Sequence, residues 1–330
     1  MISLPKLPES WDELTPEQMV YTNKCRYEHG TSEENYLLHM FMYFTHTAIV
    51  KGEILNDEKE KDKYKYLFQQ VDEKGTPCSP KFPMEQWQIH YFITEYLQWL
   101  LKPCTRLNDL FPVIQLEGKE FGSPGYAMAN MTYQQQKTAQ QYHAAYCQIS
   151  NTLFSQLQKI KEENISVVPN EIKELLSQRQ EYKCKFLATV YSPEAMITQK
   201  QIDGETIQYT TPEKKYIYNP AQSENNWKLF RTWDEYKGDA VIQLFNGVMI
   251  HYKKIFPLLF TETPDNGPTD YIEVEQSTIN ALQSELQFSN YQTIYDSNAP
   301  FIFGKLNDLI LSAKKLKEQE LRSRAHKRLK

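Results

Sequence analysis

Residues 132–162 read TYQQQKTAQQYHAAYCQISNTLFSQLQKIKE, and this stretch decides the fold class. An α-helix has about 3.6 residues per turn, so one of its faces shows apolar residues at steps of three and four. Here the steps are four, three, four, four and three, and glutamine and lysine occupy the other face. We predict a long amphipathic helix with this apolar stripe: Tyr142, Tyr146, Ile149, Leu153, Leu157 and Ile160.

The stripe allows two interpretations. It fits ordinary packing against a protein core, which is what most amphipathic helices do. A coiled-coil seam with another chain is the alternative, although the stripe covers only about three heptads and lacks clean charge pairs at its flanks. The sequence leaves both open.

Signals on either side of this stretch predict a mainly α-helical protein. The tetrapeptide TPEQ at 15–18 is typical of a helix start, because Thr15 can cap, Pro16 suits the first helical position and Gln18 completes a capping box. The segment 84–101 has few polar positions, so we expect that helix to lie in a core. We predict helices over about 15–30, 31–51, 84–101, 170–190, 224–236, 239–260 and 277–286, and from 301 onward.

Two short segments break the helical pattern. Asp203-Gly204 lies between the β-prone runs 196–202 and 205–210, and Asp-Gly favours a two-residue hairpin turn because both turn positions adopt positive φ. An isolated hairpin is marginal in water, so this one either docks on the protein or extends as a contact arm. Residues 113–121 predict a second, tight hairpin. We therefore predict a multi-helix body with a small β-hairpin insertion near 196–210.

Local composition divides the chain into four parts. Within the first part, residues 52–82 are predicted to form a charged connector. The four predicted parts are an N-terminal helical part at 1–102, an irregular connector at 103–130, a central and C-terminal helical part at 131–313 that carries the hairpin, and a basic helical tail at 314–330.

The overall composition is that of a globular protein. Hydrophobic residues make up 40% of the 330 residues, charged residues make up 24%, and the formal net charge is −5. This balance argues against wholesale nucleic-acid binding. The first ten residues lack the apolar segment of a signal peptide, and no apolar stretch is long enough to span a bilayer. We expect a cytosolic protein without membrane contact.

No catalytic, cofactor-binding or metal-binding motif stands out. The five cysteines lie 26 or more residues apart, so we expect free, mostly buried thiols. His39 and His46 share a helix face at a spacing of seven, which is typical of an ordinary packed or surface pair. The chain has no G-x-S-x-G elbow, and Pro124 removes a backbone donor from the glycine-containing loop 121–125. We predict a non-enzymatic protein with no cofactor, and an enzyme with a concealed site stays an alternative.

The last segment has an unusual charge. Residues 314–330 contain eight lysines or arginines, opposed only by Glu318 and Glu320. Such a run is consistent with a solvated helix end, where cations are favoured by the helix dipole. It is also consistent with docking on an acidic protein, or with contacts to nucleic-acid phosphates, although no aromatic residue is interleaved for base stacking.

Three short segments carry a resemblance to a known group of proteins. Residues 7–15, LPESWDELT, resemble the opening of proteins from phages and prophages of Bacteroidetes. Residues 133–149 ahead of LATVYSP at 187–193 are similar to a tail-assembly or baseplate-associated protein of such phages, except that Ser192 stands where those proteins usually show arginine. The apolar segment 245–252 agrees with them as well.

The resemblance implies a role in virion assembly or in the virion itself, phage structural proteins as partners, and the host cytoplasm as the place of action. It supplies no active-site residue. Together with the tail and the hairpin, it leads us to predict a phage assembly factor or tail or baseplate component that acts by binding protein, with a nucleic-acid-associated protein as the alternative. The candidate partner-binding residues are Trp11, Asp203, Gly204, Arg322, Arg324, Lys327 and Arg328.

Overall fold

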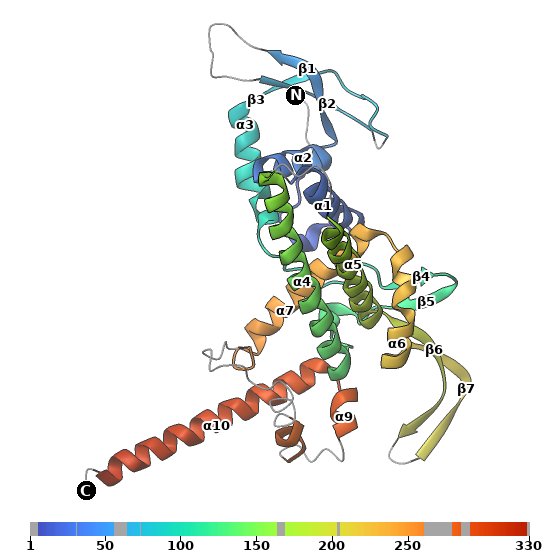
Figure 1. The fold of residues 1–330 in the computed structure, drawn as a ribbon, viewed down its shortest axis with the longest axis vertical. Helices are drawn as coiled ribbons and strands as arrows, with labels where there is room; N and C mark the ends of the chain where they lie inside the picture. The colour runs from blue at the N-terminus through green and yellow to red at the C-terminus, as the bar shows by residue number, and fades with distance from the viewer. Residues whose placement is uncertain are drawn as a thin grey trace. The chain divides into compact units, whose positions relative to one another are not determined.

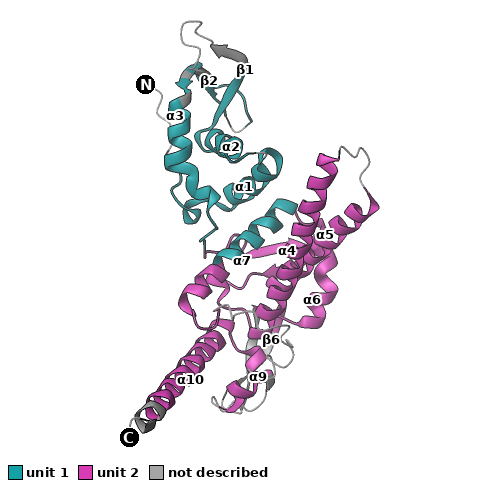
Figure 2. Ribbon diagram, turned by 60° about the vertical axis from the view of Figure 1, so that its left-hand side comes forward, with its two compact units in different colours: residues 1–106, 235–247 teal, residues 107–234, 248–330 magenta. Residues whose placement is uncertain are grey.

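The computed structural model describes residues 6–30, 32–55, 65–72, 74–163, 169–202, 205–260, 279–284 and 291–328. Most of the described elements are helices, accompanied by two small antiparallel sheets (Figure 1). The chain forms two compact units: residues 1–106 and 235–247 make unit 1, and residues 107–234 and 248–330 make unit 2 (Figure 2). The prediction of a mainly α-helical protein is confirmed. Among the described helices, none has the length and apolar character needed to cross a membrane.

Unit 1 begins with two helices, α1 (Pro16–His29) and α2 (Glu33–Thr45). The Thr15 hydroxyl accepts a hydrogen bond from the Gln18 amide at 3.2 Å, and the Gln18 side chain accepts one from the Thr15 amide at 2.9 Å. This capping box satisfies two backbone donors that have no partner inside the helix. The two helices pack against each other, and Phe41 of α2 has no exposed surface and contacts the rings of Phe68 and Phe92.

Helix α2 ends at Thr45, although we predicted a helix to about residue 51. His46 has left-handed backbone angles, φ 51° and ψ 47°, which turn the chain out of the helix. The β-branched residues Thr47 and Ile49 then favour a strand. A three-stranded sheet follows, in the order β1 (Thr47–Leu55), β2 (Lys65–Gln70) and β3 (Phe82–Glu85). It occupies much of the region that we expected to be a charged connector.

The helix predicted over 84–101 changes its hydrogen-bond pattern along its length. It consists of α3 (Gln86–Tyr91), a π-helical turn η2 (Phe92–Leu97) and a 3-10 turn η3 (Gln98–Leu101). One face is buried, with Leu97 and Leu100 at 0% exposure. The other face carries Trp87 at 61%, Tyr91 at 49% and Tyr96 at 42% exposure. The expectation that this segment lies in a core is therefore wrong for half of its surface, because unit 1 covers it on one side only.

Unit 2 is built around α4 (Tyr133–Glu162) and α5 (Asn170–Val190), which pack against each other. Helix α4 confirms the predicted helix over 132–162, and a capping box at Thr132 starts it. In its first turn, Gln135 Nε2 donates to the carbonyls of Thr189 at 2.8 Å and Val190 at 3.2 Å, at the end of α5. The start of one helix therefore lies beside the end of the other, so the pair runs antiparallel.

A four-stranded sheet lies in unit 2, in the order β4 (Val113–Leu116), β5 (Lys119–Gly122), β6 (Ser192–Ile202) and β7 (Glu205–Tyr216). Strands β4 and β5 form the tight hairpin predicted over 113–121. Strands β6 and β7 pair from Glu194↔Tyr216 onward, a longer span than the 196–210 that we expected. Gly122 is required in β5, because a Cβ there would lie 2.1 Å from the ring of Tyr216.

The structure also describes the 3-10 turns η1 (Trp11–Glu13) and η4 (Tyr126–Met128), helical residues 279–284, and the elements α6 (Pro220–Asn226), η5 (Trp227–Thr232), α7 (Glu235–Ile255), α9 (Tyr291–Asp296) and α10 (Ala299–Arg328). The helix predicted over 224–236 is thus replaced by α6 and η5, which end where Trp233 becomes extended. Helix α7 contributes residues 235–247 to unit 1, in contrast to the linear division that we predicted. A Cβ at Gly247 would lie 2.7 Å from the Cys104 carbonyl oxygen, so only glycine permits this approach.

Candidate functional site

Helix α10, which carries the basic tail, runs unbroken from Ala299 to Arg328 (Figure 1). Its first turns are anchored in unit 2, where Ile302, Phe303 and Leu306 are 0%, 4% and 7% exposed. From Leu311 to Ser323, every residue is exposed. Helices in proteins are usually stabilised by burial of one face, and this second half of α10 has no buried residue among those described.

The buried face of α10 continues into the exposed half. Ile302, Leu306, Leu309, Ala313 and Leu316 follow one another at steps of four, three, four and three, so they lie along one side of the helix. Leu306 is 7% exposed, whereas Leu316 is 62% exposed. An apolar stripe therefore leaves the core of unit 2 and extends into solvent.

The described basic residues of the tail lie together on one half of α10. Successive helical residues are rotated by about 100°, so Lys314 and Lys317, three residues apart, share one side of α10, and Lys315 and Arg322, seven residues apart, share the adjacent side. Arg322 is exposed. Arg324, Lys327 and Arg328 lie on the last turns of the helix, and their side chains are outside the described residues. A nucleic-acid contact would need these charges on one continuous face, and the described ones, from Lys314 to Arg322, lie within one half of the helix circumference, so the backbone geometry meets this requirement.

The other predicted contact residues lie elsewhere. Trp11 is 3% exposed and packs edge-on against Trp99 in unit 1, with ring centroids 5.2 Å apart. A side chain buried to this degree presents no surface to a partner, so the structure favours a packing role for Trp11 over the predicted contact. Asp203 and Gly204, at the predicted hairpin tip, lie outside the described residues.

The buried cysteines are not activated as nucleophiles. Burial raises the pKa of Cys25 to about 12 and the pKa of Cys104 and Cys184 to about 11. Cys147 Sγ lies 3.6 Å from His143 Nε2 on α4, but burial raises the pKa of this thiol as well. Thiols with raised pKa values stay protonated at neutral pH and react slowly. In the part of the chain that the structure describes, no group of three His, Cys, Asp or Glu residues could hold a metal ion.

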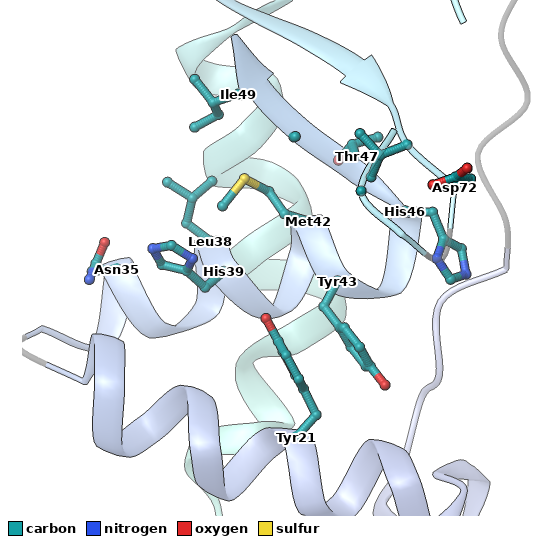
Figure 3. A pocket seen from close by; sticks show the side chains of 13 residues that line it. Tyr21, Asn35, Leu38, His39, Met42, Tyr43, His46, Thr47, Ile49 and Asp72 are labelled. Atoms are coloured by element: carbon teal, nitrogen blue, oxygen red, sulfur yellow. The ribbon is translucent and has the colours of Figure 1, made fainter. Parts of the chain in front are cut away.

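A pocket of about 800 Å³ lies within unit 1 (Figure 3). Its lining comes from α1, α2, β1 and the turn at 71–75. The α2 side contributes Asn35, Leu38, His39, Met42, Tyr43 and His46. Asn35 to Tyr43 follow helical spacing within α2, whereas His46 lies just beyond the helix in a left-handed conformation, so the prediction that His39 and His46 share a helix face is wrong. Their seven-residue separation is nevertheless the sequence signal that falls on this pocket. We interpreted that signal as an ordinary pair, because the sequence alone does not bring β1 and the 71–75 turn to the same place.

Two stacked pairs of rings lie at the pocket. Tyr21 of α1 and Tyr43 of α2 stack with centroids 3.7 Å apart and planes 9° apart. His39 stacks on His29 with centroids 3.6 Å apart and planes 7° apart. Burial raises the pKa of Tyr21 and Tyr43, and burial followed by the neighbouring His29 lowers the pKa of His39. All three rings are therefore uncharged at neutral pH.

Comparisons with known proteins add no relative. Neither protein-family models, nor curated proteins, nor solved structures match this chain. The candidate functional features are therefore the exposed half of α10 and the pocket of unit 1, each defined by its own geometry.

Proposed function

We propose that this protein is a non-enzymatic binding factor that docks on an acidic partner protein through the second half of α10. One observation carries the proposal: the apolar stripe of α10 continues from buried Leu306 to Leu316, which is 62% exposed. Helices that expose a stripe in this way commonly bind by laying it in a groove of another protein. Burial of one leucine side chain contributes roughly 1.5–3 kcal/mol, which makes Leu316 the expected anchor.

The positive charge of the tail indicates that the partner is acidic. Residues 314–330 carry eight basic and two acidic residues, in a chain whose net charge is −5. Lys315 and Lys317 lie on either side of Leu316, an arrangement that suits a groove with acidic walls. A second copy of the same basic helix would be repelled, so the stripe favours a different, acidic protein.

We further propose, from the resemblance of the three sequence segments, that the partner is a structural protein of a phage tail or baseplate. The protein would then act in the host cytoplasm during particle assembly, and it would stay in the virion if the contact persists. Strands β6 and β7 offer a second possible contact arm in this role. The resemblance alone supports the phage assignment, and the geometry of α10 supports the binding mode.

The test is a pull-down of the tagged protein from cells that are producing the phage, with and without nuclease. We expect an acidic phage structural protein to be recovered and to survive nuclease. Leu316→Asp should abolish its recovery, because a carboxylate replaces the anchor and opposes the acidic groove. Leu311→Asp is the matched control: Leu311 is also exposed, at 40%, but lies five residues before Leu316 and therefore off the stripe.

Two results would overturn the proposal. Recovery of nucleic acid alone, lost when the tail is cut before Lys314, would favour the nucleic-acid-associated alternative. Equal recovery of phage protein by the wild type, Leu316→Asp and the truncated chain would show that α10 is not the docking element.

A further inference from the structure

The pocket of unit 1 plays no part in the docking by α10 that is proposed above. We infer that it binds an uncharged, planar heteroaromatic molecule of the nucleobase or nucleoside kind. Its volume of about 800 Å³ falls within the roughly 300–1,000 Å³ that small-molecule sites occupy. The proposal is independent of the proposed function, because every lining residue belongs to unit 1 whereas α10 belongs to unit 2.

The aromatic walls select a flat ligand. Tyr21 and Tyr43 are half-buried and stacked nearly parallel, and His39 is held in a parallel stack on His29. Each pair fixes the ring plane before any ligand arrives, which reduces the entropy lost on binding. Figure 3 shows the rings of Tyr21, Tyr43 and His39 below and beside Met42, whose thioether can contact the edge of a bound ring. Leu38 adds aliphatic surface to the same side of the pocket.

The polar groups suit the edge of a heteroaromatic ring. A neutral histidine offers one N–H donor and one nitrogen acceptor, so His39 can pair with either kind of ring atom. Asn35 is held in place because its Nδ2 donates to the His29 carbonyl at 2.7 Å. Thr47 is fixed through a 2.8 Å hydrogen bond with the Thr45 hydroxyl. These side chains are anchored rather than mobile, which favours specific hydrogen bonds to a ligand.

The charges of the lining favour a neutral ligand over an anionic one. The described lining contains no lysine or arginine, and its one acidic residue is Asp72. The Asp72 carboxylate already accepts hydrogen bonds from the amides of Lys74 at 2.9 Å and Thr76 at 2.8 Å. Those bonds lower its pKa and keep it negative, so a phosphate in the pocket would meet repulsion without a compensating cation. The site therefore suits a nucleoside better than a nucleotide.

The test uses the full chain with two neutral planar probes, adenosine and indole, and with adenosine monophosphate as the charged counterpart. Saturation-transfer difference NMR measures contact with the probe's ring protons, and its concentration dependence gives the Kd. We expect at least one neutral probe to bind in the millimolar range or tighter, and adenosine monophosphate to bind about tenfold more weakly than adenosine.

Substitutions inside and outside the pocket show where the probe binds. Tyr21→Phe keeps the stacked ring, so binding should stay within about twofold, whereas Tyr21→Leu removes the ring and should weaken binding about fivefold to tenfold. Tyr27→Leu is the control, because Tyr27 is a 79% exposed tyrosine of the same helix outside the pocket. Circular dichroism confirms that each variant is folded. Failure of both neutral probes to bind, or equal binding by Tyr21→Leu and the wild type, would overturn the inference.

Discussion

Helices α4 and α10 are both 30 residues long, and both carry an apolar stripe that ends exposed, at Leu157 (44%) and Leu316 (62%), but α4 is covered over more of its length. Helix α4 is covered by α5 as far as Leu153, which is 6% exposed. Helix α10 is covered only to about Leu306, and Leu316 on the same stripe is 62% exposed. The sequence pattern is alike in the two helices, so a stripe at helical spacing does not by itself show how much of the helix this chain covers.

The sharpest test of this difference makes the same change in both helices. Loss of a buried leucine leaves a cavity, so we expect Leu153→Ala to lower the free energy of unfolding by about 2–4 kcal/mol. Leu316→Ala removes exposed surface, so we expect a change within about 0.5 kcal/mol. Urea unfolding of the two variants measures both values. If the two losses were equal, the second half of α10 would have to be covered within this chain.

The next largest effect concerns an arginine that joins the α4–α5 pair. Arg179 on α5 donates to the Tyr146 hydroxyl at 2.7 Å and the Ser150 hydroxyl at 3.1 Å, and its guanidinium lies 5.0 Å from the Tyr146 ring centroid. We expect Arg179→Met to cost about 1–2 kcal/mol, because two half-buried hydrogen bonds are lost. Arg322→Met on α10 serves as the control and should leave the melting temperature unchanged. An equal loss of stability in Arg179→Met and Arg322→Met would mean that removal of a positive charge, rather than loss of these contacts, lowers the stability.

Replacement of a single polar residue by alanine should destabilise α4 and stabilise α10. Thr132 caps α4 through a 3.1 Å bond from the Gln135 amide, so Thr132→Ala should cost about 1 kcal/mol while Thr132→Ser keeps the cap. Ser312 lies in the exposed part of α10, where alanine is the better helix former. Ser312→Ala should therefore stabilise the helix by a few tenths of a kcal/mol and raise its helical content. Thermal unfolding and far-ultraviolet circular dichroism measure the two effects. Destabilisation by Ser312→Ala would indicate that this hydroxyl has a partner.

The smallest expected effect concerns the alkaline titration of one tyrosine. Burial, followed by the 3.0 Å hydrogen bond to Glu224, raises the pKa of Tyr142 on α4 from 10.0 to about 12. The folded state then holds this proton more tightly than the unfolded state, so the contribution of Tyr142 to stability is complete below pH 10 and is lost as the pH rises toward 12. Tyr142→Phe should remove one late-titrating tyrosine from the ultraviolet absorbance curve and weaken the alkaline decline in stability. A curve that loses a tyrosine near pH 10 instead would contradict this assignment.

Much of the helical architecture could be predicted from the sequence, because its signals are local. Helices α1 and α4 have both a capping box and apolar residues at helical spacing. The end of α2 could not be predicted in this way, since the left-handed turn falls on a histidine where glycine would be the usual signal. The exposed face of Trp87, Tyr91 and Tyr96 was missed because their aromatic character alone favours burial.

The two candidate sites were predictable to different degrees. The charge of the tail is visible in 314–330, but its exposure follows from where unit 2 stops covering α10. The pocket needed the fold, because α1, α2, β1 and the 71–75 turn meet only after β1 has folded back over α2. Local pattern specifies which residues share a face, and tertiary structure decides what lies opposite that face.

Helix α7 also has a consequence for biosynthesis. Its residues 235–247 complete unit 1, and the close approach of Gly247 to Cys104 requires them to be present. During translation, residues 1–106 emerge first, and all of 107–234 must be made before the missing piece of unit 1 appears. At typical bacterial or eukaryotic synthesis rates this delay is on the order of ten seconds. The nascent N-terminal part therefore lacks the buried side chains of Val241 and Phe245 throughout that interval, and unit 1 is completed only when they arrive.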